Sequence, residues 1–147
     1  MAGQIQTGAP QQFPFSAVLA GAMEVPPVPS LGSGTALLGF DSTLSTIRVF
    51  LTVSNLSQVT AAHIHLGRPG QNGPIVLFLF GPSPGINIGA PAVLTNASFT
   101  AANLTGPLAG MPLSMLARAI FEGNAYVNVH TVANPNGEIR GQIQRRI

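Results

Sequence analysis

Three histidines are the side chains of this sequence that are best suited to chemistry. The sequence has no cysteine or lysine, one tyrosine and four carboxylates. His63 and His65 flank Ile64, and His130 follows a valine-rich segment. Side chains alternate between the two faces of a β-strand, so His63 and His65 should point the same way. Two imidazoles on one face and a third on another strand form a ligand set that borderline transition metals favour.

This pattern predicts a mononuclear metal site with three neutral imidazole ligands. Such a site leaves at least one coordination position open. Because the chain has no thiolate to favour Cu(I), copper as Cu(II) or zinc as Zn(II) is expected, one ion per chain. The alternative is structural: neutral imidazoles that bond to loop backbone and hold no metal.

Other polar residues should share the face of the histidines. A hairpin is expected from strands at 125–131 and 137–145, joined by a turn at 134–137. Its valines and isoleucines alternate with polar residues, so one face carries Tyr126, Asn128, His130, Glu138, Arg140 and Gln142. If the strand at 61–66 neighbours 125–131, all three imidazoles meet at one polar site.

The remaining pattern predicts an all-β domain. Further strands are expected at 13–20, 35–40, 46–54, 75–80 and 92–99, with Gly/Pro-rich segments between many of them and the run at 75–80 buried on both faces. Residues 81–91 are expected to be a loop. The only convincing helix lies at about 112–122 and precedes Gly123. Many short strands and one helix indicate a Greek-key β-sandwich or barrel over residues 13–147, preceded by a flexible arm at 1–12.

The surface must be unusually poor in charge. Only 7% of the 147 residues are charged, against about a quarter in typical domains. This favours a secreted, coat or assembled protein, at an extracellular, cell or spore surface, and a homo-oligomer. No basic stripe indicates nucleic-acid binding, and no apolar run is long enough to span a membrane. No signal peptide is visible, because residues 1–12 lack a basic region followed by an apolar run.

Three long motifs in this chain resemble those of the CHRD domain family, which is named for repeats in chordin. They occur in the family's order, and the similarity extends over about 13–143. The opening motif is residues 15–27, the central motif is 61–67 with 70–74, and the closing motif is 123–131 with 134–142. The resemblance implies fold more than activity, and it includes the possibility of a metal-free protein-binding module.

A more distant similarity is to Cu,Zn superoxide dismutase. The resemblance implies that His63, His65 and His130 would hold copper, and that Arg140 would line a channel for a small anion such as superoxide. This chain lacks the bridging histidine, the zinc ligands and the cysteine pair of that pattern. A two-metal dismutase site is therefore excluded, while one mononuclear site is compatible with the sequence.

Several neighbouring residues have more than one interpretation. Arg140 could steer an anion or support the site, or it could form a cross-strand ion pair with Glu138. Glu24 could anchor its loop, accept a hydrogen bond from Arg140 or orient a histidine. Tyr126 is expected to pack, with Asn128 beside it.

No nucleophile elbow, phosphate loop or carboxylate pair is visible, so no catalytic residue is predicted. The leading hypothesis is a non-catalytic surface, matrix or coat protein with a three-histidine metal site. The alternative is a copper-dependent redox enzyme or copper-buffering protein.

Overall fold

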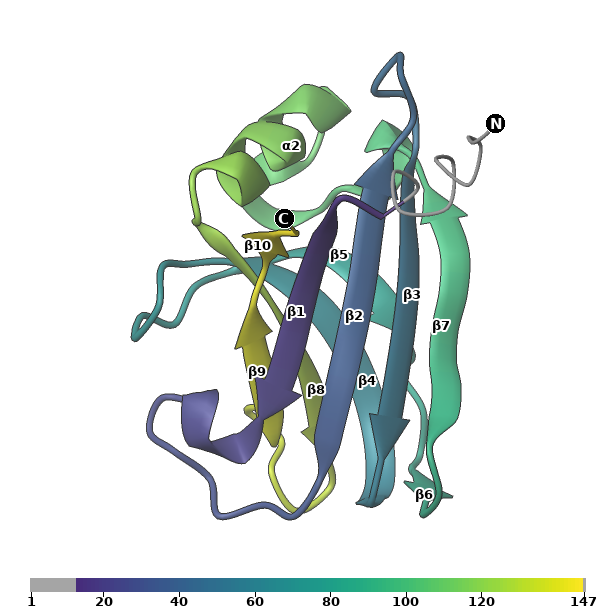
Figure 1. Ribbon diagram of the computed structural model, residues 1–147, viewed down its shortest axis with the longest axis vertical. Coiled ribbons are helices and arrows are strands. Elements are labelled where there is room, and N and C mark those ends of the chain that lie inside the picture. The colour runs from purple at the N-terminus through teal and green to yellow at the C-terminus, as the bar shows by residue number, and fades with distance from the viewer. Residues whose placement is uncertain (1–12, 147) are drawn as a thin grey trace, which may run out of the picture.

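The polypeptide forms an antiparallel sheet that curls until its two ends nearly meet (Figure 1). The computed structural model describes residues 13–146, so the arm predicted at 1–12 lies outside the described residues. The strands are β1 (Phe15–Ala20), β2 (Ser33–Phe40), β3 (Ile47–Ser54), β4 (Leu56–Leu66), β5 (Ile75–Phe80), β6 (Ile86–Ile88), β7 (Ala92–Phe99), β8 (Ala125–Thr131), β9 (Ile139–Gln142) and β10 (Gln144–Arg145).

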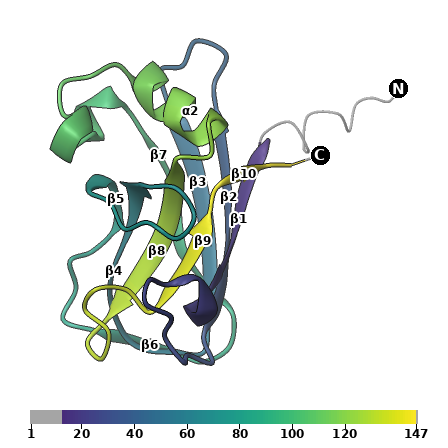
Figure 2. The same ribbon diagram turned by 90° about the vertical axis from the view of Figure 1, so that its left-hand side faces the viewer.

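The strand order is β5-β4-β8-β9-β1-β2-β3-β7. Strands β1, β2, β3 and β7 make one layer, and β4, β5, β8 and β9 make the other (Figure 2). The chain crosses between the layers from β3 to β4, again on the way to β7, and a third time before β8. The predicted all-β, Greek-key type of sandwich or barrel is confirmed.

The barrel is almost closed between β5 and β7, the two ends of the strand order. The buried Thr95 of β7 donates its hydroxyl proton to the carbonyl oxygen of Leu79 in β5, over 3.0 Å. This side-chain bond satisfies a backbone acceptor that strand pairing would otherwise use. This bond therefore connects the two layers at the open seam.

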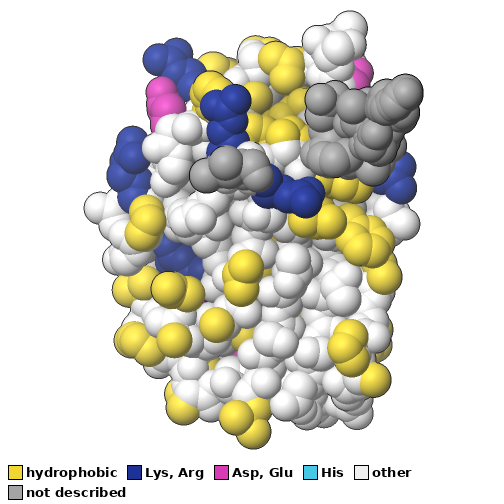
Figure 3. Space-filling view, viewed as in Figure 1, with side chains coloured by type: hydrophobic (Ala, Val, Ile, Leu, Met, Phe, Trp, Pro, Cys, Tyr) yellow, Lys and Arg dark blue, Asp and Glu magenta, His cyan; other side chains and the backbone are white. Residues whose placement is uncertain are grey.

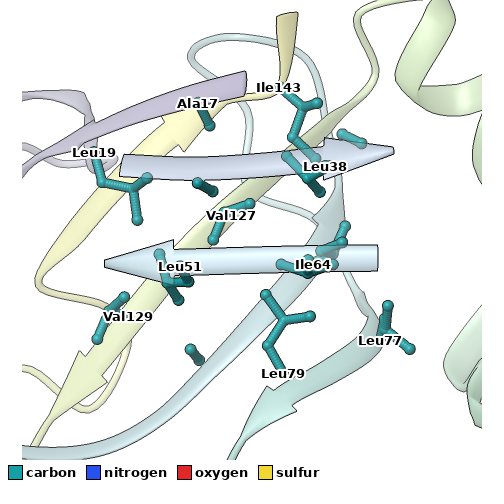
Figure 4. Packing of buried hydrophobic residues seen from close by; sticks show 14 of the residues in the cluster. Ala17, Leu19, Leu38, Leu51, Ile64, Leu77, Leu79, Val127, Val129 and Ile143 are labelled. Carbon is teal, nitrogen blue, oxygen red and sulfur yellow. The ribbon is translucent and has the colours of Figure 1, made fainter. Parts of the chain in front are cut away.

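The core lies between the layers because each strand alternates apolar and polar residues. In β3, Ile47, Val49, Leu51 and Val53 are fully buried, as the alternation predicts. They meet apolar side chains of the opposite layer, among them Ile64 and Val127 (Figure 4). This packing fixes which face of β4 and β8 points inward, and therefore places the histidines on the other face.

Four details differ from the sequence expectations. Strand β4 begins at Leu56 rather than Ala61, and the short strand β6 lies within the predicted loop at 81–91. Strand β5 is not buried on both faces, because Phe78 is 45% exposed. The last predicted strand, 137–145, is divided into β9 and β10, with Ile143 between them bonded to the carbonyl oxygen of Ala125.

The predicted helix is present as α2 (Leu113–Phe121), and it ends before Gly123, whose φ of +74° suits glycine. Three single-turn 3-10 helices, at Gly21–Met23, Ala101–Asn103 and Gly106–Leu108, complete the described elements. No helix in residues 13–146 is both long enough and apolar enough to cross a membrane.

The layer that contains β1, β2 and β3 presents an almost uncharged face. Figure 3 shows it covered by polar uncharged and scattered apolar side chains, with the basic side chains gathered toward the α2 end. Val18 of β1 is 72% exposed on this layer. The low content of charged residues in the sequence thus leaves most of this face without charged side chains.

Candidate metal site

Strands β4 and β8 are neighbours, and this brings the three histidines together. The register pairs His63 with Asn128 and His65 with Tyr126, while His130 lies opposite Ala61. One ring nitrogen from each histidine can be chosen so that all three lie within 4.8 Å of one another. The strand that carries His63 and His65 therefore pairs with the strand that carries His130, and the three predicted histidines form one cluster.

The cluster is covered rather than exposed. His63, His65 and His130 are only 6–8% exposed, although their side chains point away from the apolar core. All seven residues of β8 are buried, so this strand is covered on both faces. The expectation of an outer, solvent-facing polar face is corrected: loops close over it and form a second, polar interior.

Two loop carbonyls orient two of the rings. The Nδ1 atom of His65 lies 2.9 Å from the carbonyl oxygen of Gly73, and that of His130 lies 2.8 Å from the carbonyl oxygen of Pro135. A carbonyl oxygen only accepts, so both Nδ1 atoms carry the proton. In the neutral rings, each Nε2 atom then offers a lone pair. This is the usual way in which a second bond fixes a metal-binding histidine.

The third ring is linked to its neighbour. His63 Nδ1 lies 3.0 Å from His130 Nε2. Because His130 Nε2 holds a lone pair, His63 Nδ1 is the donor. Two ring nitrogens remain, His63 Nε2 and His65 Nε2, and of these His65 Nε2 is buried and has no hydrogen-bond partner. A buried acceptor without a partner in the middle of a histidine cluster is the atom that an additional group would satisfy.

All three rings are held in the neutral form. Burial lowers the pKa of His63 to about 3, with smaller contributions from the charges that His130 and His65 would carry. Burial also lowers the pKa of His65 and of His130, although their loop carbonyls act in the opposite direction. Neutral imidazole is the form that binds a metal ion, so the ligands need no deprotonation at neutral pH.

A stack of three side chains runs across β4, β8 and β9. The rings of His65 and Tyr126 are parallel within 7°, with centroids 4.9 Å apart. The guanidinium carbon of Arg140 lies 3.4 Å from the centre of the Tyr126 ring. Because β8 lies between β4 and β9, Tyr126 separates the arginine from the histidine. Tyr126 thus packs between these two side chains, and its hydroxyl also accepts from the Gly73 amide over 3.0 Å.

Arg140 is buried and committed to the loop that covers the histidines. Its guanidinium donates to Asn72 Oδ1 over 3.1 Å and to the carbonyl oxygens of Arg68 and Gln71 over 3.1 and 2.7 Å. The same loop supplies the Gly73 carbonyl that orients His65. These contacts favour a supporting role for Arg140 over attraction of an anion.

Glu138 does not join the histidine cluster. Its carboxylate accepts from Ser30, Thr131 and Asn134, which ties the turn after β8 to the loop before β2. No ion pair between Glu138 and Arg140 occurs among residues 13–146, whose only side-chain ion pair is Arg118–Glu122. These contacts give Glu138 a structural function at the hairpin.

Glu24 and Asn128 form a buried pair behind His65. Asn128 Nδ2 lies 3.5 Å from Glu24 Oε2, and the Asn128 side-chain oxygen has no partner. Burial raises the pKa of Glu24 to about 7, against the lowering effects of Asn128 and Arg140. Glu24 has no hydrogen bond with Arg140 in the described structure. Gly137 makes room for this pair, since a Cβ there would lie 2.4 Å from Asn128 Nδ2.

Three contributors to the site were not identified from the sequence. Gly73 and Pro135 act through backbone oxygens, which residue types do not reveal, although both fall in the motifs that carry the CHRD resemblance. Phe78 covers the outer side of the cluster, with its ring centre 4.6 Å from that of His63. The apolar segment 75–80, which contains Phe78, predicted only a buried strand.

Comparison with known proteins gives one match. The family model of the CHRD domain matches residues 15–143, which is nearly the whole chain. Neither the curated proteins nor the solved structures include one that matches.

Proposed function

The chain belongs to the CHRD domain family, and from that premise we propose that it is a non-catalytic module that holds one copper or zinc ion through His63, His65 and His130. A surface, matrix or coat protein, present outside the cell or on a cell or spore surface and as a homo-oligomer, is the setting that we propose for it. The uncharged face in Figure 3 supports that setting.

The unpartnered His65 Nε2 atom carries the metal proposal. It lies in a cluster of neutral rings in which loop carbonyls hold the Nδ1 atoms of His65 and His130 and so direct their Nε2 lone pairs. Without a metal ion, this acceptor has no partner in the described structure. A metal ion satisfies it and both neighbouring nitrogens together.

The spacing of the nitrogens fits a single ion after a small adjustment. Zinc binds histidine nitrogen at about 2.0–2.1 Å, which places two tetrahedral ligands about 3.3 Å apart and ligands on opposite sides about 4.1 Å apart. His63 Nδ1 and His130 Nε2 are already 3.0 Å apart, whereas the three-atom set extends to 4.8 Å. Metal binding should therefore draw the most distant pair of nitrogens together by about 0.7 Å if they take opposite positions, and by about 1.5 Å in tetrahedral geometry.

Titration calorimetry of protein without an affinity tag tests the proposal. We expect Zn(II) and Cu(II) to bind at one ion per chain, with the affinity lost in His65→Gln. Glu122→Gln serves as the control, because it removes an exposed carboxylate far from the cluster that could bind metal weakly. The alternative of a metal-free protein-binding module would be favoured if the wild-type protein binds no metal. It would also be favoured if the wild type and His65→Gln bind metal with equal affinity.

A copper-dependent redox or copper-buffering protein is the second candidate, since the same three nitrogens would hold Cu(II). We expect copper-loaded protein to dismutate superoxide no faster than an equal amount of free copper. A much faster rate that falls in Arg140→Ala would replace the non-catalytic proposal with the enzymatic one. Light scattering of the native protein tests the setting: an ordered oligomer agrees with it, and a strict monomer at high concentration contradicts it.

A further inference from the structure

The outer face of β1, β2, β3 and β7 is a broad surface that the described residues leave open (Figure 3). Val18 on the β1 side is 72% exposed, and Val93 on the β7 side is 54% exposed. Arg48 is the only charged residue in these four strands, and its guanidinium donates to Asn96 Oδ1 on the same face. Depletion of charge is what marks the core of a protein–protein interface.

The strand registers arrange this face in rows that run across the four strands. From β1 to β7, one row consists of Val18, Thr35, Thr52 and Val93. The next row consists of Ser16, Leu37, Phe50 and Asn96. All eight side chains are at least partly exposed. The first row reads the same from both ends, and the second is polar at both ends and apolar in the middle. The face is therefore nearly symmetric about a line between β2 and β3.

We propose that this face is the interface between two copies of the chain, related by a two-fold axis that runs between β2 and β3 and parallel to them. The rotation places β1 of one copy opposite β7 of the other, and β2 opposite β3. Each row then meets the same row reversed. Val18 lies opposite Val93 of the second copy, and Thr35 lies opposite Thr52. The inference rests on the homo-oligomer of the proposed function and names its surface.

The chemistry of the rows favours a second copy over a different partner. Leu37 meets Phe50, so apolar side chains cover each other at the centre. Ser16 meets Asn96, whose side-chain NH₂ group is a donor for the serine hydroxyl, because its oxygen is bonded to Arg48. A partner with an ordinary density of charge would bury charges that this face cannot pair. An isologous interface requires this kind of self-complementarity.

The size of the face is compatible with a dimer. Four strands about 4.8 Å apart and up to about 27 Å long project an area on the order of 500 Å². The accessible surface of protruding side chains is larger than this projection. Each partner in an interface of standard size buries about 800 Å². Face-to-face packing of the two sheets therefore supplies enough contact without a further surface.

Sedimentation equilibrium of the full chain tests the face. We expect a wild-type dimer, and in Thr35→Arg a dissociation constant that is higher by roughly 100-fold or more, because the two-fold axis brings two unpaired charges together. Ser114→Arg is the matched control, since it adds the same charge to an exposed position of α2. Thr52→Asp should also weaken the dimer, and its mixture with Thr35→Arg should restore association, because the two positions lie opposite each other.

Two results would overturn the proposal. One is a wild type that stays monomeric at high concentration, which would assign the face to a different partner. The other is an oligomer that Thr35→Arg leaves unchanged, in which case the proposed homo-oligomer forms through another face. Titration with Zn(II) reports on the metal site separately, because the histidines are in the other layer. We expect Thr35→Arg to bind Zn(II) as the wild type does.

Introduced cysteines test the arrangement even if Thr35→Arg does not fold, because the chain has no cysteine of its own. Val18→Cys and Val93→Cys each replace an exposed side chain. In the proposed dimer these positions face each other across sheets about 10 Å apart, whereas the two copies of Val18 are also about 14 Å apart sideways. A short bismaleimide should link the mixed variants at least about tenfold faster than it links either variant alone. Equally fast linking of Val18→Cys with itself would overturn the two-fold arrangement.

Discussion

The Nδ1 atom of His63 lies 3.0 Å from the Nε2 atom of His130, in a pair of buried neutral imidazoles. His130 Nδ1 is committed to the Pro135 carbonyl, so the proton between the two rings belongs to His63. A metal ion held by both atoms must displace this proton. The hydrogen bond of the metal-free protein and the metal site are therefore alternative states of the same two nitrogens.

This relationship predicts a change of tautomer in one ring only. In the metal-free protein all three histidines should be Nδ1–H tautomers. On addition of Zn(II), His63 should become the Nε2–H tautomer, while His65 and His130 keep their protons on Nδ1 because loop carbonyls accept them. Nitrogen-15 chemical shifts of the imidazoles measure this directly. A His63 ring whose shifts do not move at saturating Zn(II) would contradict the assignment of Nδ1 as its ligand atom.

The loop over the cluster should depend on the fork geometry of Arg140. Its guanidinium satisfies three loop oxygens, from Arg68, Gln71 and Asn72. Loss of these bonds in Arg140→Ala should lower the free energy of unfolding by about 3 kcal/mol or more, measured by urea denaturation. Arg140→Lys should restore little of this, because an ammonium cannot contact all three positions.

Metal affinity distinguishes a positioning role from a general loss of stability. We expect Arg140→Lys to weaken Zn(II) binding at temperatures where the variant is fully folded, because the Gly73 carbonyl that orients His65 loses its support. Arg48→Lys is the control, since Arg48 is exposed and bonds only to Asn96 in the described structure. Equal Zn(II) affinity in wild type and Arg140→Lys would limit Arg140 to a stabilising role.

The metal-free protein should become less stable as pH falls below 6.5. The pKa values of the histidines are lower in the folded protein than the ordinary value of 6.5, and that of His63 is about 3. The unfolded chain therefore takes up more protons as the pH decreases. His63 should contribute a loss of up to about 1.4 kcal/mol per pH unit between these two values, and His65 and His130 should add losses of the same sign below 6.5.

Glu24 acts in the opposite direction over part of this range. Its pKa is raised from 4.5 to about 7, so the folded protein holds a proton that the unfolded chain has lost between these values. Its contribution is fully present below pH 4.5 and is lost as pH rises through 7. Urea denaturation between pH 4 and 8 should show a net loss on acidification that is smaller in His63→Gln and larger in Glu24→Gln. The same slope in wild type and His63→Gln would contradict the buried neutral state of His63.

The sequence predicted the histidine trio because strand alternation is a local rule. His63 and His65 had to share a face, and the apolar partners Ile64, Val127 and Val129 showed which face that was. The hairpin turn at 134–137 placed β9 beside β8 in the same way. The pairing of β4 with β8 connects residues about 65 positions apart, and only the fold shows it.

The covering of the site could not be predicted by the same rule. Alternation separates the core face from the other face, but it does not reveal whether loops cover the second face. Here Arg140 and Glu138 have charged side chains that suggested an exposed ion pair, and each is instead bonded within a loop network. The backbone carbonyl acceptors of Gly73 and Pro135 cannot be identified from the residue type, because every residue has a carbonyl oxygen.

The coordination of Cu(II) by the three histidines is the most direct test of the metal site. Electron paramagnetic resonance of tag-free protein with one equivalent of Cu(II) should show hyperfine splitting from three nitrogens. The splitting should decrease to two nitrogens or disappear in each of His63→Gln, His65→Gln and His130→Gln, with Glu122→Gln unchanged. A wild-type spectrum that matches free Cu(II), or one that none of the three substitutions alters, would contradict the three-histidine site.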